Sequence, residues 1–187
     1  MKSLLTGIMC LLLIGTSFSQ EIEGTEFGID GYFGVSNLGG SVSVGAKYGL
    51  KLNENVIVGP SLRVQRNWSK NDFTGVSGSY TIYGPGVFGH ARFGNVLFAG
   101  AEFEVMRSPF ATSTYTGYSN GPVWTPALFL GGGYSQEFNE SFRLNAGVMY
   151  DVLDRPNSPF RQGYFMRNAN NVLIPLIYRI TFFFVLS

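Results

Sequence analysis

Apolar and polar residues alternate with a period of two over residues 42–52 and again over residues 142–152. Successive side chains of a β-strand point to opposite faces, so this pattern gives each stretch one apolar face and one polar face. The apolar faces carry Val42, Val44, Ala46, Tyr48, Leu50 and Leu52 in the first stretch and Phe142, Leu144, Ala146, Val148, Tyr150 and Val152 in the second. Both stretches are predicted to be strands.

The same test predicts eight strands and indicates no helix after the first 19 residues. The strands are expected at residues 25–35, 40–52, 56–67, 79–92, 96–107, 124–138, 142–153 and 173–186. The fourth segment can be read in either parity. We place Tyr83, Val87, Ala91 and Phe93 on its apolar face and Gly84, Gly86, His90 and Arg92 on the other. The fold class is therefore all-β.

Short and long connections alternate along the chain. The links at 53–55, 94–95 and 139–141 are short and rich in turn-forming residues, whereas those at 68–78, 108–123 and 154–172 are long. Only the first link, at 36–39, is short where the alternation calls for a long one. This arrangement predicts an eight-stranded antiparallel up-and-down barrel with its short turns at one end.

Low charge separates a transmembrane barrel from a soluble one. Only 13% of the residues are charged, against about 25% in soluble domains, and the polar faces consist mostly of Gly, Ser, Asn and Thr. Small polar residues suit the narrow interior of an eight-stranded barrel, so the apolar faces are predicted to contact lipid. A net charge of +1 argues against nucleic-acid binding, and the hydrophobicity argues against disorder.

The first 19 residues have the form of a secretory signal peptide. Lys2 precedes an apolar stretch from Leu4 to Ile14, and the small-x-small triplet 17–19 follows, which predicts cleavage before Gln20. The alternative, a membrane anchor, needs a longer apolar core. Cys10 lies within the segment, so the predicted domain at 20–187 has no cysteine.

Aromatic residues gather toward both ends of the predicted strands. The short-turn end has Phe27, Phe93, Phe138, Phe142 and Phe184, and the long-loop end has Trp68, Tyr80, Trp124 and Tyr150. Two aromatic belts are expected where a barrel meets the lipid–water interfaces. The alternative is that aromatic residues simply favour strands.

Residues 21–187 resemble the small eight-stranded outer-membrane β-barrels of bacteria, the OmpA- and OmpX-like barrels. The C-terminal segment 174–187 looks like the assembly signal of that family through Arg179, Thr181, Phe184 and Leu186, although Thr181 stands where glycine is commoner and Ser187 follows the last apolar residue. The stretch 83–93 also looks like a strand of such barrels. The resemblance implies insertion by the outer-membrane assembly machinery, with both termini in the periplasm.

Six charged residues are expected at similar mid-height on the inward faces: Asp30, Lys47, Arg63, Glu102, Glu104 and Arg179. Three are basic and three acidic, and buried charges are costly unless they are paired. We therefore hypothesise a network of ion pairs that closes the lumen to ions. The alternative is a narrow pore for ions or small solutes that these residues line.

Catalysis and metal binding receive little support. Glu102 and Glu104 share one face and could do acid–base chemistry, but ion pairing with the inward basic groups explains them more simply. A lipid A-modifying hydrolase would need His90, the only histidine, beside a serine and a carboxylate, and no serine is adjacent in sequence. With one histidine and no mature cysteine we expect no metal, no cofactor and no enzymatic activity.

The long loops carry residue types that recognition surfaces favour. The candidate interaction surface consists of Tyr115, Tyr118, Arg155, Arg161, Tyr164 and Arg167. Its partner would be an extracellular ligand of unknown identity or the phosphates of lipopolysaccharide, and a purely structural role in the outer membrane is the alternative. We expect a monomer surrounded by outer-membrane lipid.

Four prolines fall within or near the predicted strands, although proline cannot donate to a β-ladder. Pro126 and Pro175 are near strand starts. Pro60 and Pro85 each follow a glycine, and we expect them to mark β-bulges.

Overall fold

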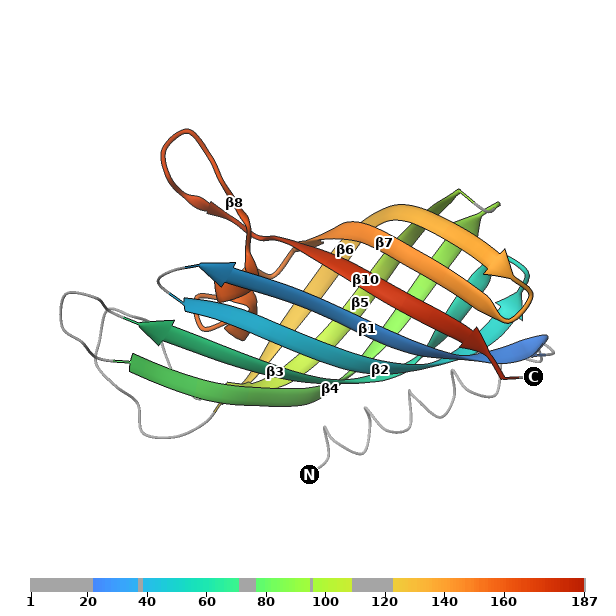
Figure 1. The fold of residues 1–187 in the computed structure, drawn as a ribbon, viewed down its shortest axis with the longest axis horizontal. Helices are drawn as coiled ribbons and strands as arrows, with labels where there is room; N and C mark the ends of the chain where they lie inside the picture. Colours follow the sequence, from blue (N-terminus) through green and yellow to red (C-terminus); the bar gives the residue numbers. More distant parts are fainter. Residues whose placement is uncertain (1–21, 37–38, 71–76, 95, 109–122, 187) are drawn as a thin grey trace, which may run out of the picture.

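The chain forms a closed antiparallel β-barrel (Figure 1). The computed structural model describes residues 22–36, 39–70, 77–94, 96–108 and 123–186. Around the barrel the strands follow the order β1-β10-β7-β6-β5-β4-β3-β2, so every barrel strand pairs with its neighbours along the chain and β10 closes the circle against β1. The predicted eight-stranded up-and-down topology is confirmed.

The barrel strands agree closely with the eight predicted segments. Their bounds are β1 Gly24–Ser36, β2 Gly39–Asn53, β3 Val56–Lys70, β4 Ser77–Phe93, β5 Leu97–Ser108, β6 Val123–Asn139, β7 Phe142–Asp151 and β10 Leu176–Val185. The link between β7 and β10 holds a 3-10 helix, η1 (Pro159–Gly163), and a small hairpin of β8 (Met166–Arg167) and β9 (Leu173–Ile174). No helix in the described ranges is long and apolar enough to cross a membrane.

Alternation along each strand sets which side chains face the interior. In β2, Val42, Val44 and Tyr48 are exposed on the outer wall, whereas Ser43 and Lys47 are buried. The same holds for β4, where Tyr83 and Val87 are exposed and His90 and Arg92 are buried, so the parity chosen for that strand is correct. Because the outer wall is apolar and buried polar and charged side chains occupy much of the interior, the barrel differs from an ordinary soluble domain.

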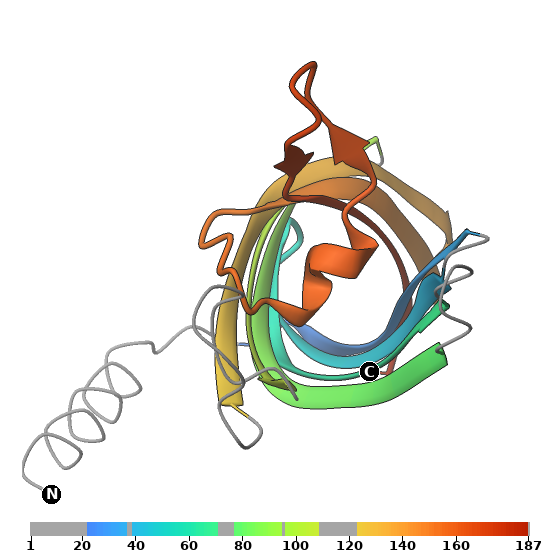
Figure 2. The same ribbon diagram turned by 90° about the vertical axis from the view of Figure 1, so that its left-hand side faces the viewer.

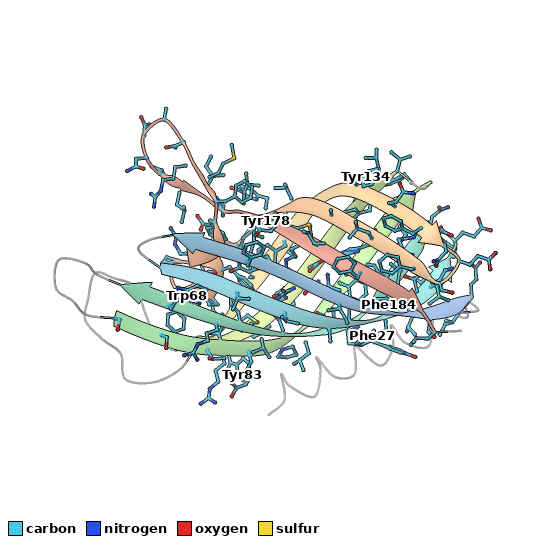
Figure 3. All side chains as sticks on the ribbon, viewed as in Figure 1. Phe27, Trp68, Tyr83, Tyr134, Tyr178 and Phe184 are labelled. Atoms are coloured by element: carbon cyan, nitrogen blue, oxygen red, sulfur yellow. The ribbon has the colours of Figure 1, made fainter. Side chains whose placement is uncertain are left out.

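Aromatic residues occur on the outer wall toward both barrel ends. Phe27 and Phe184 lie together at the short-turn end, and Trp68 lies toward the long-loop end (Figure 3). Tyr80 was predicted in the second belt, but it packs against a cluster inside the barrel. Tyr80 shares its parity with the buried Ile82, so its side chain points inward.

Pro60 and Pro85 lie in strands without the predicted bulges. Pro60 pairs opposite Val87, and Pro85 opposite Leu62, in one continuous β3–β4 ladder. On the other flank of each proline the ladder is interrupted, β2–β3 at residues 59–60 and β4–β5 at residues 84–85, and the register is the same on both sides of each gap. The missing proline N–H is thus accommodated by a local gap rather than by an inserted residue. Register shifts occur instead beside short turns, at 51–53 and 137–139.

The interior is layered along the barrel axis. The inward residues of β10 run from Ile177 through Arg179 and Thr181 to Phe183. Ile177 belongs to an apolar cluster at the long-loop end, and Phe183 belongs to a smaller apolar cluster with Ile57 and Phe88 at the other end. Charged side chains lie between the two clusters. The predicted signal peptide falls outside the described residues.

Candidate functional site

The six charged residues expected inside the barrel meet in one buried cluster between the two apolar layers. They come from five strands: Asp30 from β1, Lys47 from β2, Arg63 from β3, Glu102 and Glu104 from β5, and Arg179 from β10. Because β5 lies on the opposite side of the barrel from β1 and β10, pairs between these strands cross the lumen. We call this set the charge network.

Asp30 joins two basic residues, Lys47 from the adjacent β2 and Arg63 from β3. Its Oδ2 atom accepts from Arg63 Nη2 at 2.6 Å and lies 3.1 Å from Lys47 Nζ. Arg63 also donates from Nη1 to the Ser43 hydroxyl at 2.9 Å. The carboxylate has room because the residue opposite it on β2 is Gly45, where a Cβ atom would lie only 2.1 Å from Asp30 Oδ1.

The two glutamates complete the bridge across the lumen. Glu102 Oε1 accepts from Lys47 Nζ at 2.6 Å, and Arg63 Nε donates to Glu104 Oε2 at 2.9 Å. Arg179 Nη1 contacts both glutamates and donates to Glu104 Oε1 at 2.6 Å. Every side chain of the charge network is at most 4% exposed. Breaking a pair in such a setting typically costs about 3–5 kcal/mol because one charge is left buried without a partner.

His90 is attached to the charge network, a contact that sequence reasoning did not predict. Its Nε2 lies 2.9 Å from Glu102 Oε1, and its Nδ1 lies 3.4 Å from the Asn145 amide. The rings of Phe88, Phe98 and Phe183 surround it at centroid distances of 5.1–5.9 Å. The parity chosen for this strand predicted an inward histidine, but only the barrel stagger brings it to Glu102. Its bonded partners are a carboxylate and an amide rather than a hydroxyl.

A second buried ion pair lies toward the short-turn end. Arg92 of β4 donates two hydrogen bonds to the Glu26 carboxylate of β1, at 2.8 and 2.6 Å. The Arg92 guanidinium also lies 4.9 Å from the centre of the Phe183 ring. Both residues were on predicted strands with inward parity, but nothing in the sequence marked the pair, because the partners are 66 positions apart.

Part of the loop after β7 folds into the mouth of the barrel. Figure 2, which views the molecule from the long-loop end, shows η1 within the outline of the barrel. The Phe160 side chain is fully buried, and its ring meets the Phe129 ring edge-on at 4.9 Å. Gln65 Nε2 donates to the Pro159 carbonyl at 3.2 Å, and Asn157 Nδ2 donates to the Thr125 hydroxyl at 3.0 Å. We call residues 157–164 the inward plug.

Tyr164 is the exception among the predicted loop-surface residues that the structure describes. It is only 7% exposed, and its hydroxyl donates to Asp151 Oδ2 at 2.7 Å, so it anchors the inward plug rather than presenting a binding surface. Burial and the adjacent Asp151 carboxylate raise the pKa of Tyr164 above its usual value. Arg155 and Arg167 are exposed, and Arg161 pairs with Asp154 at 2.6 Å. Tyr115 and Tyr118 lie outside the described residues.

The barrel has a counterpart among solved structures. The structure of the Yersinia pestis outer membrane protein Ail in a phospholipid bilayer nanodisc matches 88% of this chain and 100% of its own, with a TM-score of 0.51 and 16% sequence identity. This chain has the fold of an eight-stranded outer-membrane β-barrel. No protein-family model matches the sequence, and no curated protein matches it.

In this barrel the residues of the predicted assembly signal divide between its two faces. Arg179 and Thr181 are buried inside, whereas Phe184 and Leu186 are exposed on the outer wall. Among the residues that the structure describes, no group of three or more His, Cys, Asp or Glu side chains is arranged to hold a metal ion.

Proposed function

We propose that the protein is an integral protein of the bacterial outer membrane whose lumen is closed to ions and solutes. The charge network carries this proposal, because its ion pairs connect β5 to β2, β3 and β10 through the middle of the lumen. Eight strands leave an interior just wide enough for side chains, and buried, paired side chains cross it here. The protein therefore has a structural role or presents a surface, and is not a pore.

The inward plug supports closure at a second level. Phe160, Tyr164 and the residues around them form an apolar cluster at the long-loop mouth, on the loop side of Arg179. A solute entering from that end would have to displace the plug before it reached the charge network. The two closures involve different chemistry, since one is ionic and the other is mainly apolar.

The exposed apolar wall supports a membrane location. Large hydrophobic side chains such as Phe33, Val44 and Val87 are more than half exposed, an arrangement that is unfavourable in water and favourable in lipid. The structurally similar Ail was itself solved in a phospholipid bilayer. We place the short-turn end and both termini in the periplasm and the long loops outside the cell, with insertion by the outer-membrane assembly machinery.

Conductance across planar lipid bilayers tests closure. We expect the refolded protein to give no steady single-channel current above that of the lipid. A heat-modifiability gel of the same preparation controls for insertion, because a folded barrel migrates differently before and after boiling. Steady, large unitary conductance would overturn closure and favour the narrow pore.

Cell fractionation tests the location independently. We expect the protein in the outer-membrane fraction, released by detergent and heat-modifiable. Recovery as a soluble periplasmic protein would overturn the membrane proposal, whatever the bilayer recording shows.

The exposed arginines favour a surface-interaction role over a purely structural one. Arg155 and Arg167 are exposed on the loop after β7. The sequence from Arg155 onward holds no Asp or Glu, and the adjacent Asp154 pairs with Arg161. Substituting both with Gln leaves the inward plug intact and separates the roles. Loss of binding to cell-surface or lipopolysaccharide preparations would support the interaction role, and unchanged binding would count against it.

A further inference from the structure

The seam that closes the barrel is incomplete at its long-loop end. β1 pairs with β10 from Glu26 opposite Val185 to Gly31 opposite Ile180. Beyond Gly31, β1 continues to Ser36 and stays paired with β2, but no β10 residue pairs with it. The outer half of β1 therefore has backbone groups on the seam side that need other partners.

Tyr178, from the other side of the seam, supplies partners for the backbone of Phe33. Its hydroxyl accepts from the Phe33 backbone N–H at 3.2 Å and donates to the Phe33 carbonyl. The ring stands edge-on to Tyr32 at 6.0 Å. One side chain thus replaces a rung of the ladder and holds the two strands apart at this height.

A hollow of about 280 Å³ lies beside Tyr178 on the outer wall. Its floor is Gly31, which interrupts a row of bulky outward residues, and its walls are almost wholly apolar side chains: Phe33, Val42, Tyr178, Ile180 and Phe182. Elsewhere these strands carry large side chains outward, so the hollow is a local recess in the apolar band. A methylene chain is the shape and chemistry that such a recess accommodates.

The β8–β9 hairpin leaves the barrel rim beside this hollow. Figures 1 and 2 show the hairpin projecting sideways from the barrel rim rather than along the barrel axis. The Phe165 ring at its root lies 6.2 Å from the Tyr178 ring, so the hairpin is continuous with the wall of the hollow. Phe165, Met166 and Val172 are about half exposed.

The charge of the hairpin is positive. Arg167, two residues beyond Phe165, is exposed and donates to the Asn171 carbonyl at 3.0 Å, which holds the guanidinium on the hairpin. No Asp or Glu occurs between Arg155 and the end of the chain. An exposed guanidinium on a hairpin whose root contacts the wall of an apolar recess is complementary to an anionic phosphate headgroup attached to an acyl chain.

We propose that the β1–β10 seam binds one phosphate-bearing anionic membrane lipid, with an acyl chain in the hollow over Gly31 and the headgroup against Arg167. This rests on the proposed membrane location. Three features that meet at Tyr178 carry the proposal: the recess, the unpaired end of the seam and the root of the basic hairpin. A lipid acyl chain bound there would occupy the apolar recess that the outward side chains of the barrel leave open.

Native mass spectrometry tests the lipid site. The protein is refolded into vesicles of equal parts phosphatidylcholine and phosphatidylglycerol, extracted into mild detergent, and weighed with its retained lipid. We expect one retained lipid, enriched in phosphatidylglycerol. Gly31→Leu fills the recess and should abolish retention, whereas Arg167→Gln should keep a lipid and lower the preference for phosphatidylglycerol by about fivefold.

Gly89→Leu is the matched control, because Gly89 also faces the outer wall and a Cβ there makes only ordinary contact, at 3.5 Å from Val58. It should behave as wild type. If Gly31→Leu does not fold, Val42→Phe narrows the recess from β2 and should weaken retention in its place. Retention unchanged by the filled recess, or lipid in the same ratio as the vesicle, would overturn the lipid site. Failure of the wild type to insert, shown by the absence of a heat-modifiable band, would instead overturn the membrane location.

Discussion

The Phe160 ring lies 5.8 Å from the guanidinium carbon of Arg179, so the loop after β7 reaches the charge network from the long-loop end. Phe129 forms the other contact, with its ring centre 4.4 Å from the same carbon. Two aromatic rings therefore contact a cation that also pairs with Glu102 and Glu104. Such cation–π contacts are strongest when they are shielded from water. The inward plug and the charge network thus share Arg179 as a common member.

Glu102→Gln should destabilise the barrel more than any comparable change at its rim. The amide keeps the shape but replaces one acidic partner of Lys47 and of Arg179 with a neutral group, which should lower the free energy of unfolding by about 3 kcal/mol. Glu137→Gln is the control, because its pair with Arg143 is partly exposed and should contribute about 0–1 kcal/mol. Urea titration of the protein in vesicles measures both. A loss of only about 0–1 kcal/mol for Glu102→Gln would show that its ion pairs do not stabilise the fold.

Phe160→Ala should release the inward plug while the barrel stays folded. Removing a fully buried ring typically costs about 3–5 kcal/mol. Here we expect that cost to weaken docking of the inward plug rather than folding of the barrel. Trypsin cleavage after Arg161, located by mass spectrometry, should accelerate roughly a hundredfold. Phe165→Ala in the same loop removes an exposed ring and should leave cleavage at Arg161 unchanged. Cleavage at the wild-type rate in Phe160→Ala would show that the plug does not depend on this ring.

Gly59→Ala should prevent normal barrel formation. The β2 backbone approaches so closely that a Cβ on residue 59 would lie 1.8 Å from the Tyr48 carbonyl oxygen, and a backbone atom cannot yield without breaking the sheet. We expect a loss of about 4 kcal/mol or more, seen as a missing heat-modifiable form after refolding. Gly89→Ala should refold normally. A folded Gly59→Ala barrel would mean that the ladder gap at Pro60 is flexible enough to widen.

The strands could be predicted from the sequence because alternation is local. The inward parity of Lys47 follows from its immediate neighbours, whatever the rest of the chain does. That of His90 required a choice between two possible parities of its strand. Contacts across the lumen are different, because they depend on strand stagger and on how many strands close the barrel. Lys47 and Glu102 could be assigned to one level by counting from the short turns, whereas the contact of His90 with Glu102 could not.

The loop after β7 was beyond sequence reasoning for another reason. Phe160 and Tyr164 lie in a stretch without periodicity, and aromatic residues in a polar loop usually indicate an exposed recognition surface. Their burial depends on an open mouth that only the assembled barrel provides. Tyr80 was placed on the wrong side because belt position was considered without parity.

The pKa of Tyr164 should make docking of the inward plug sensitive to alkaline pH. The raised pKa means that the docked loop holds the phenolic proton more tightly than a released loop, whose tyrosine ionises near pH 10. Docking is therefore fully favoured below about pH 10 and weakens as pH rises past it. Ultraviolet absorbance of tyrosinate, compared between wild type and Tyr164→Phe, isolates this group and should place its midpoint above that of an ordinary tyrosine. Asp151→Asn removes the nearby negative charge but leaves the burial, so it should bring the midpoint down toward the ordinary value. A wild-type midpoint near pH 10 would show that the hydroxyl is not buried against Asp151 and that the loop does not fill the barrel mouth.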